Sequence, residues 1–147
     1  MATEFTKIND FVEHTAEKVH NLSSDQLAVA LSNTAPASET NNPTADGNGV
    51  LANVTQISYT NLSSRNITIS SSAQTSGTYK LVLSDLTLTA SGGSVGPFRY
   101  IYVYNDTPTS PADPLIAVYD YGSSLTLNDG DSLTIDFDGS AGFLTIA

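Results

Sequence analysis

Two histidines are the residues of this chain best suited to act as a catalytic base. His14 and His20 are the only histidines among its 147 residues. Hydrolysis of the Ser-His-Asp type needs a histidine that lies beside a serine and is oriented by a carboxylate. Both histidines fall in a stretch with helical spacing, and a separation of six residues puts them on different faces of a helix. We therefore predict solvent-facing helix histidines and no catalytic residues of this type.

Four aspartates near the end of the chain are the second candidate, at positions 129, 131, 136 and 138. Asp136 and Asp138 share one face of an extended chain, as a pair of calcium ligands or an acid–base pair would. However, the spacing does not match an Asp-x-Asp-x-Asp-Gly loop, and no glutamate follows at the bidentate position. We favour aspartates that shape turns and discourage strand aggregation, and we expect no metal and no cofactor.

Alternating tyrosines are the third candidate, as a platform on which sugars or bases could stack. Tyr100, Tyr102 and Tyr104 lie on one side of an extended run over 97–104, and Arg99, Ile101 and Val103 lie on the other. A period of two built from aromatic and β-branched residues is typical of a strand, and two bulky sides indicate that both faces are covered. Because tyrosine buries a large area, we favour packing over a stacking platform.

Composition narrows the remaining function classes. Five Lys and Arg stand against fifteen Asp and Glu, which gives a formal net charge of −10. Such a surface repels phosphate and anionic lipid, so we expect no nucleic-acid and no membrane partner. The absence of cysteine excludes disulfides and thiolate zinc sites. No signal-peptide pattern and no apolar run of roughly 20 residues is present, so we expect synthesis in the cytoplasm.

The strand at 97–104 is expected to be the centre of an all-β domain. Further strands are predicted over 27–32 (half buried), 50–59, 65–71, 79–90, 114–121, 123–127, 133–137 and 143–146. A change of phase at 84–85 predicts a β-bulge or a bend between sheets. The Asn-Asp-Gly-Asp sequence at 128–131 predicts a hairpin turn. Short connections favour an antiparallel β-sandwich, of which the jelly roll is one form.

One amphipathic helix is predicted over 5–20, with apolar residues at Ile8, Phe11, Val12, Ala16 and Val19. This gives an N-terminal helical segment at 1–24 and a β-sandwich domain at 25–147. A long polar loop with turn composition is predicted over 34–49, where we expect contacts with other chains to provide its order.

Several blocks along the chain carry a resemblance. They are FTK to HNL over 5–22, LSNTAP at 31–36, YTNLSSR at 59–65, TSGTYKL at 75–81, GPFRY at 96–100, YND at 104–106 and DYGSS at 120–124. In this order the chain resembles a family of small virion structural proteins of tailed bacteriophages, over nearly its whole length. The blocks carry no catalytic residues, and they do not distinguish a head protein from a tail protein.

The resemblance implies a non-enzymatic, multi-copy component of a bacteriophage virion. Its implied partners are the major capsid protein or other virion proteins, bound as a capsid cement or decoration protein that stabilises the shell and forms a homo-oligomer such as a trimer. The alternative is a small tail protein or a receptor- or glycan-binding virion protein. An unrecognised hydrolase that uses Asp136 and Asp138 is the third and least favoured alternative. The residues that we expect at the interface are Phe5, Ile8, Phe11, Val12, Pro36 and Pro43.

Overall fold

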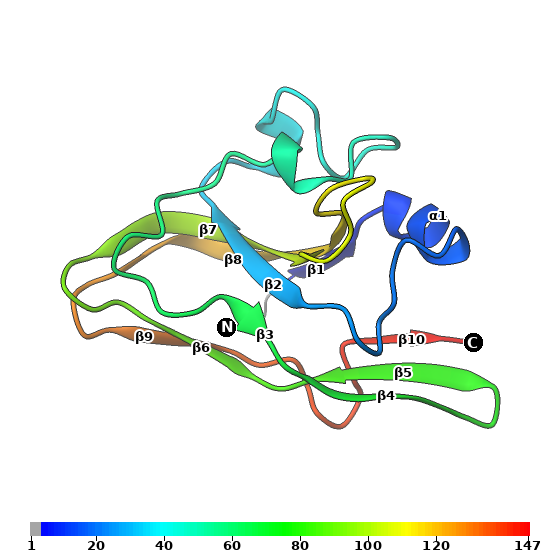
Figure 1. Cartoon of the computed structure of the whole chain (residues 1–147). Coiled ribbons are helices and arrows are strands. Elements are labelled where there is room, and N and C mark those ends of the chain that lie inside the picture. Colours follow the sequence, from blue (N-terminus) through cyan, green and yellow to red (C-terminus); the bar gives the residue numbers. More distant parts are fainter. Residues whose placement is uncertain (1–3) are drawn as a thin grey trace.

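The structure is a computed structural model that describes residues 4–147. The described part consists mainly of antiparallel strands with a single α-helix, which confirms the all-β prediction (Figure 1). The helix α1 spans Asp10–Ala16, and the 3₁₀ helices η1 and η2 span Pro36–Ser38 and Leu51–Asn53. The strands are β1 Glu4–Lys7, β2 Leu27–Ser32, β3 Asn66–Ile67, β4 Ile69–Thr75, β5 Thr78–Leu83, β6 Leu86–Thr89, β7 Val95–Asn105, β8 Leu115–Leu127, β9 Ser132–Ile135 and β10 Leu144–Ile146.

The upper layer in Figure 1 is a five-stranded sheet with the order β1-β8-β7-β2-β3. The predicted central strand is β7, which pairs with β2 on one side and β8 on the other. Both faces of β7 are covered, because Tyr102 is fully buried on one and Val103 on the other. The prediction that β2 is half buried was wrong: all six of its residues are buried, since a loop covers the face that was expected to meet solvent.

The lower layer consists of a three-stranded sheet, β10-β5-β4, and a two-stranded sheet, β6-β9. The single strand expected over 79–90 is divided at 84–85, so that β5 belongs to one of these sheets and β6 to the other. The carboxylate of Asp85 accepts the backbone N–H of Phe137 at 3.0 Å and fixes this division. The predicted bend between sheets is thereby confirmed, and together the two layers form a sandwich-like fold.

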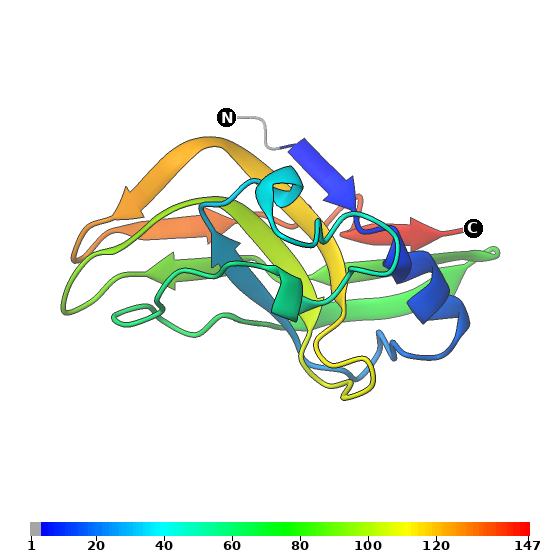
Figure 2. The same ribbon diagram turned by 90° about the horizontal axis from the view of Figure 1, so that it is seen from above.

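A loop over 33–62, here called the covering loop, lies on the outer face of the five-stranded sheet (Figures 1 and 2). It includes η1 and η2, and the strand expected over 50–59 does not form. The apolar side chains of 50–59 do not alternate between two faces of a strand. Leu51 and Val54 pack onto the five-stranded sheet and are buried in the core. The N–H of Ile57 bonds to the carbonyl of Leu31 at 3.0 Å and attaches the loop to β2.

The N-terminal prediction was wrong in part, because the expected helix over 5–20 is a strand followed by a short helix. Residues Glu4–Lys7 form β1 and pair with β8, with Phe5 opposite Tyr119. The N–H of Ile8 continues this ladder to the carbonyl of Ile116 at 3.0 Å. The segment 1–24 therefore contributes a strand to the main sheet. Within the described residues, no helix is long and apolar enough to cross a membrane.

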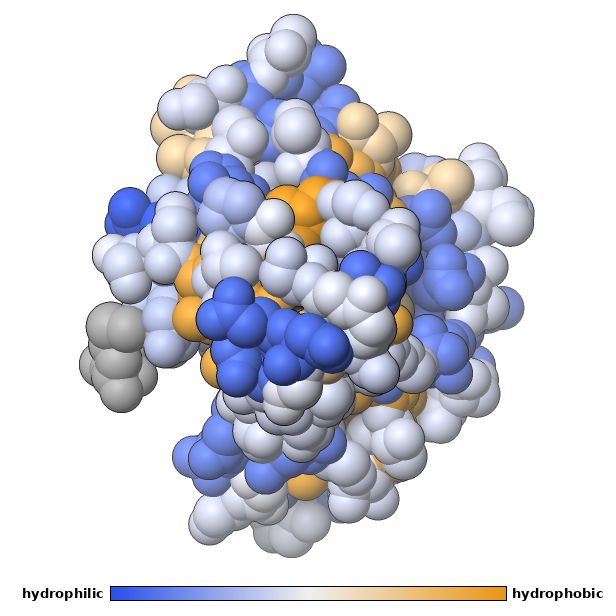
Figure 3. Space-filling view, turned by 90° about the vertical axis from the view of Figure 1, so that its left-hand side faces the viewer, coloured by the Kyte–Doolittle hydropathy of each residue, from blue (hydrophilic) through white to orange (hydrophobic). Residues whose placement is uncertain are grey.

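The turn at 128–131 forms, but it is not a hairpin turn. It joins β8 to β9, and these strands belong to different sheets, so that β9 pairs with β6. Backbone bonds of 2.8 Å and 3.0 Å connect Gly130 and Asp131 with Ala90, which holds the turn against the loop that follows β6. Figure 3 views the molecule from this end and shows mostly hydrophilic surface, with apolar residues in small separate patches.

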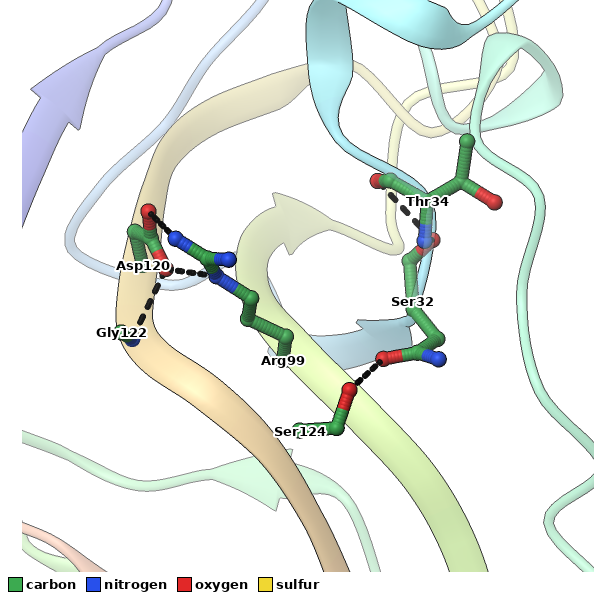
Figure 4. Close-up of polar contacts among 7 residues, drawn as sticks. Ser32, Thr34, Arg99, Asp120, Gly122 and Ser124 are labelled. Carbon is green, nitrogen blue, oxygen red and sulfur yellow. Dashed lines mark hydrogen bonds and ion pairs between the residues drawn. The ribbon is translucent and has the colours of Figure 1, made fainter.

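Strand β8 is one continuous strand where two were predicted, and it bends at Gly122, whose φ is +96°. Opposite this bend the register shifts between Phe98 and Tyr100 of β7. Figure 4 shows the contacts around it: Arg99 donates to both carboxylate oxygens of Asp120 at 2.7 Å and 3.0 Å. The bond from Arg99 lowers the pKa of Asp120. The same carboxylate accepts the N–H of Gly122 at 2.8 Å, so this ion pair has a structural role at the bend.

Candidate functional site

The two histidines are placed differently from the prediction. Helix α1 ends at Ala16, so His20 lies beyond it, and the chain turns back so that this ring is only 8 % exposed. The rings of His14 and His20 lie 6.0 Å apart and are neighbours, not residues on opposite faces. The bonded side chain next to His20 is Asn105, an amide, at 3.0 Å. The prediction of solvent-facing helix histidines was therefore wrong for His20.

The aspartates at 136 and 138 bond to the backbone of their own turn. Asp136 accepts the N–H of Asp138 at 2.9 Å, and Asp138 accepts those of Ala141 and Ser140 at 2.9 Å and 3.0 Å. These backbone bonds lower the pKa of Asp138, whereas a general acid needs a raised pKa. The interpretation that these aspartates shape turns is confirmed. Within residues 4–147, no group of three or more His, Asp or Glu is arranged to hold a metal ion.

The tyrosine side of β7 faces the covering loop and is buried. The exposed fractions of Tyr100, Tyr102 and Tyr104 are 8 %, 0 % and 4 %. Burial raises the pKa of the Tyr102 hydroxyl far above its usual value. The packing interpretation is confirmed, and these rings present no stacking surface.

The covering loop is held by hydrogen bonds within the chain, and contacts between this loop and other chains stay a prediction. Asp10 at the start of α1 accepts the N–H groups of Gly47 and Gly49 at 2.9 Å and 2.8 Å. Glu39 accepts both the N–H and the hydroxyl of Thr55 at 2.7 Å. Charge-assisted bonds of this kind are among the stronger hydrogen bonds in proteins, so they account for an ordered polar loop.

The predicted interface residues separate into a buried and an exposed group. Ile8, Phe11 and Pro43 are buried inside the protein, and Pro36 is partly buried. Phe5 and Val12 remain exposed, at 44 % and 55 %. They lie on different elements, because Phe5 belongs to β1 and Val12 to α1. Of the six predicted interface residues, only these two are largely exposed apolar residues in the structure.

Phe5 belongs to an aromatic cluster where the two layers meet. Its ring lies 5.3 Å from that of Tyr119 and 5.9 Å from that of Phe143, and Phe137 joins the cluster at 5.8 Å from Phe143. Both strands that border it, β1 and β10, are edge strands of their sheets. We call this region the open seam: the four rings Phe5, Tyr119, Phe137 and Phe143 with the edges of β1 and β10. Figure 2 shows the ribbons of these two strands.

Two grooves flank the open seam. A groove of about 240 Å³ lies between β1 and β10 and is lined by Phe5, Lys7, Phe11, Ile116, Phe143, Leu144 and Thr145. A larger and more polar groove of about 880 Å³ lies beside Tyr119 and Tyr121, and Asp136 and Asp138 border it. The smaller groove suits an apolar side chain, and the larger one suits a ligand with both apolar and hydroxyl groups.

The backbone of β1 adds hydrogen-bonding groups to this surface. In an antiparallel pair, alternate residues bond to the partner strand. Because Ile8 bonds to β8, the residues two and four positions earlier face β8 as well. The N–H and C=O groups of Phe5 and Lys7 therefore point away from the sheet, where an added strand would meet them.

Sequence reasoning did not find the open seam, because its rings come from β1, β8 and the segments that flank β10. The sequence signal for β1 was the alternation of polar and larger side chains at 4–7. This stretch is too short to outweigh the helical spacing of apolar residues that follows it. Comparison with known proteins adds no constraint: no family model, no curated protein and no solved structure matches the chain.

Proposed function

We propose that this chain is a non-enzymatic structural protein that binds a larger protein assembly through the open seam. The observation that carries the proposal is Phe5, a large aromatic residue that stays 44 % exposed on an edge strand. The resemblance in the sequence supports one kind of assembly, the bacteriophage virion. There the chain acts as a cement or decoration protein on the major capsid shell, after synthesis in the host cytoplasm.

The open seam offers the two components of strand addition. The outward backbone groups of Phe5 and Lys7 supply main-chain hydrogen bonds, and the groove beside Phe5 supplies a pocket for an apolar side chain. Repeated docking of many copies around a shell stabilises it by mass action, because each copy binds the assembled form only. The net charge of −10 favours a basic or neutral surface on the partner and disfavours nucleic acid.

Immunogold labelling of virions from the phage that encodes this chain tests the assignment. Label spread over the heads supports the cement role, and label confined to the tail supports a tail role. No label on the particles would contradict the virion proposal.

Rebinding to particles made without the protein then tests the surface. We expect Phe5→Ala to weaken binding at least tenfold, since truncation of a central aromatic anchor costs about 2 kcal/mol or more, and about 1.4 kcal/mol corresponds to a factor of ten. Val12→Ala is the matched control, because Val12 is at least as exposed as Phe5 but lies on α1 and lines a different groove. Weakened binding only for Val12→Ala would transfer the interface to the helix.

A second candidate function, binding of a glycan by a small tail or receptor-binding protein, is favoured by the larger groove. Tyr119 and Tyr121 supply aromatic surface there, and the free oxygens of Asp136 and Asp138 supply hydrogen-bond acceptors. Glycan-array binding that is lost in Tyr121→Ala and kept in Phe5→Ala would support this candidate over strand addition.

A further inference from the structure

The segment 17–26 connects α1 to β2 and is attached to the protein at few points. Beyond α1 the chain reverses direction at Lys18, whose φ is +66°, and the N–H of Val19 bonds back to the carbonyl of His14 at 2.8 Å. Of the side chains in 17–26, only His20 and Leu22 are buried. A segment with so few buried side chains opens at a lower free energy than the sheets that it joins.

One buried amide holds the middle of this segment, whose last residue, Gln26, is fixed separately by hydrogen bonds with Asp106 and Thr107 at 2.8 Å. Asn105, at the end of β7, is fully buried, and its side-chain N–H groups donate to His20 Nδ1 at 3.0 Å and to an oxygen of Asp25 at 2.6 Å. Its carbonyl oxygen accepts the N–H of Thr107 at 3.1 Å. The same oxygen of Asp25 accepts the N–H of Asn21 at 2.8 Å. We call His20, Asp25 and Asn105 the latch.

The partners of Asn105 fix the direction of every bond in the latch. A flipped amide would place its oxygen against the carboxylate of Asp25 and its N–H groups against the N–H of Thr107, so the flip is excluded. His20 Nδ1 must therefore accept, and the proton of the neutral ring is on Nε2, an atom without a bonded partner among the described residues. This tautomer also excludes Nε2 as a metal ligand.

Protonation of His20 is incompatible with this arrangement. A proton on Nδ1 would point at the N–H group of Asn105, which cannot turn away without losing Asp25 and Thr107. An imidazolium in this buried position would also be poorly solvated.

The groups around His20 give little compensation for a positive charge. From α1, His14 faces it at 6.0 Å between ring centres, and Lys18 shares with it a cavity of about 440 Å³ whose far wall includes Tyr79 of β5. Among the described residues, Asp25 is the anion that favours the charged form of the His20 ring. Burial and His14 outweigh it and lower the pKa of His20 to about 4.

We propose that the latch is an acid-sensitive device: in mildly acidic solution His20 takes up a proton, Asn105 releases it, and the segment 17–26 opens while the β-sandwich stays folded. This goes beyond the proposed binding function and needs no ligand.

Amide hydrogen exchange of the full chain tests the proposal. The pKa of His20 is 6.5 when the segment is open and about 4 when it is closed. We therefore expect the equilibrium constant for opening of 17–26 to rise about 30-fold between pH 8 and pH 5, after correction for intrinsic exchange rates. Protection in β7 and β8 should remain unchanged. Unchanged protection of 17–26, or an equal loss of protection along the whole chain, would overturn the proposal.

Two variants assign the effect to one ring. His20→Asn keeps an acceptor near the Nδ1 position and cannot take up a proton, so its exchange at 17–26 should lose the pH dependence. His14→Gln is the matched control and should keep it. If His20→Asn opens the segment at every pH, the nitrogen NMR signals of the wild-type ring decide: a bare Nδ1 and a protonated Nε2 at pH 7 support the latch, and the opposite tautomer refutes it.

Discussion

The molecule has two groups of aromatic residues, and only one of them keeps a largely exposed ring. The tyrosines of β7 lie beneath the covering loop and are at most 8 % exposed. In the open seam Phe137 and Phe143 are also buried, at 2 % and 8 % exposed, but Phe5 on the edge strand β1 remains 44 % exposed. The residue types are similar, so composition does not distinguish the two surfaces. The difference lies in the polar loop, whose bonds to Asp10 and within itself keep it over the first surface.

The largest effect is expected at the covered surface. Tyr102→Ala removes a fully buried ring beside the loop, and we expect it to lower the free energy of unfolding by about 3–5 kcal/mol, as for other large-to-small core substitutions. Urea unfolding at pH 7.5 measures this. A loss below about 1 kcal/mol would mean that the loop does not seal this face, and the contrast with the open seam would fail.

The next effect concerns the segment that leads from α1 to β2. His20 has a pKa of about 4 in the folded chain, below its ordinary 6.5, so the unfolded chain binds more protons between these values. The stabilisation is therefore fully present above pH 6.5 and is lost as the pH falls toward 4, by at most about 3 kcal/mol. Urea unfolding at pH 7.5 and 4.5 measures the loss, and His20→Asn should remove most of it. Equal losses in both proteins would show that carboxylates elsewhere are responsible.

The covered surface could largely be predicted from the sequence, because alternation is a local signal. The strand over 97–104 and the break at 84–85 both follow from the phase of neighbouring side chains. The strand expected over 50–59 failed for a physical reason. Leu51 and Val54 have apolar character that suits a strand, but they are buried as a cover on the sheet, and only tertiary packing distinguishes the two.

The open seam and the latch could not be predicted, because each joins residues far apart in the chain. Phe5 meets Tyr119 through the pairing of β1 with β8, and no local pattern contains that pairing. His20 and Asp25 are neighbours in sequence, but Asn105, which holds them, lies some eighty residues later. The helical spacing of Ile8 and Phe11 also led to the wrong prediction of one long helix. The strand before it has only four residues, which is too few to reveal the two-residue alternation of a strand.

A smaller effect on stability is expected at the open seam. Because Phe5 is already 44 % exposed, Phe5→Ala should lower the free energy of unfolding by only about 1 kcal/mol, well below the loss for Tyr102→Ala. The same substitution should weaken binding to the assembly at least tenfold. A variant that unfolds as readily as Tyr102→Ala would show that Phe5 is a core residue, and the seam would lose its role as a surface kept for a partner.

The smallest effect, that of Tyr102→Phe, is compared with the effect of Tyr59→Phe to find which contacts hold the covering loop. The hydroxyl of Tyr102 is buried without a hydrogen-bond partner among the described residues, whereas that of Tyr59 accepts the N–H of Leu31 at 3.0 Å and donates to Gln56 at 2.6 Å. Tyr102→Phe removes an unsatisfied group and should leave stability unchanged or raise it by up to about 1 kcal/mol. Tyr59→Phe leaves an N–H of β2 unpaired and should cost about 1–2 kcal/mol. If urea unfolding shows a loss of stability for Tyr59→Phe and a gain for Tyr102→Phe, the loop is held by the hydrogen bonds of Tyr59, whereas Tyr102 makes only apolar contacts with it. A clear loss of stability for Tyr102→Phe would instead mean that its hydroxyl is hydrogen-bonded beneath the loop, so that the hydroxyls of both Tyr59 and Tyr102 hold the loop on the sheet.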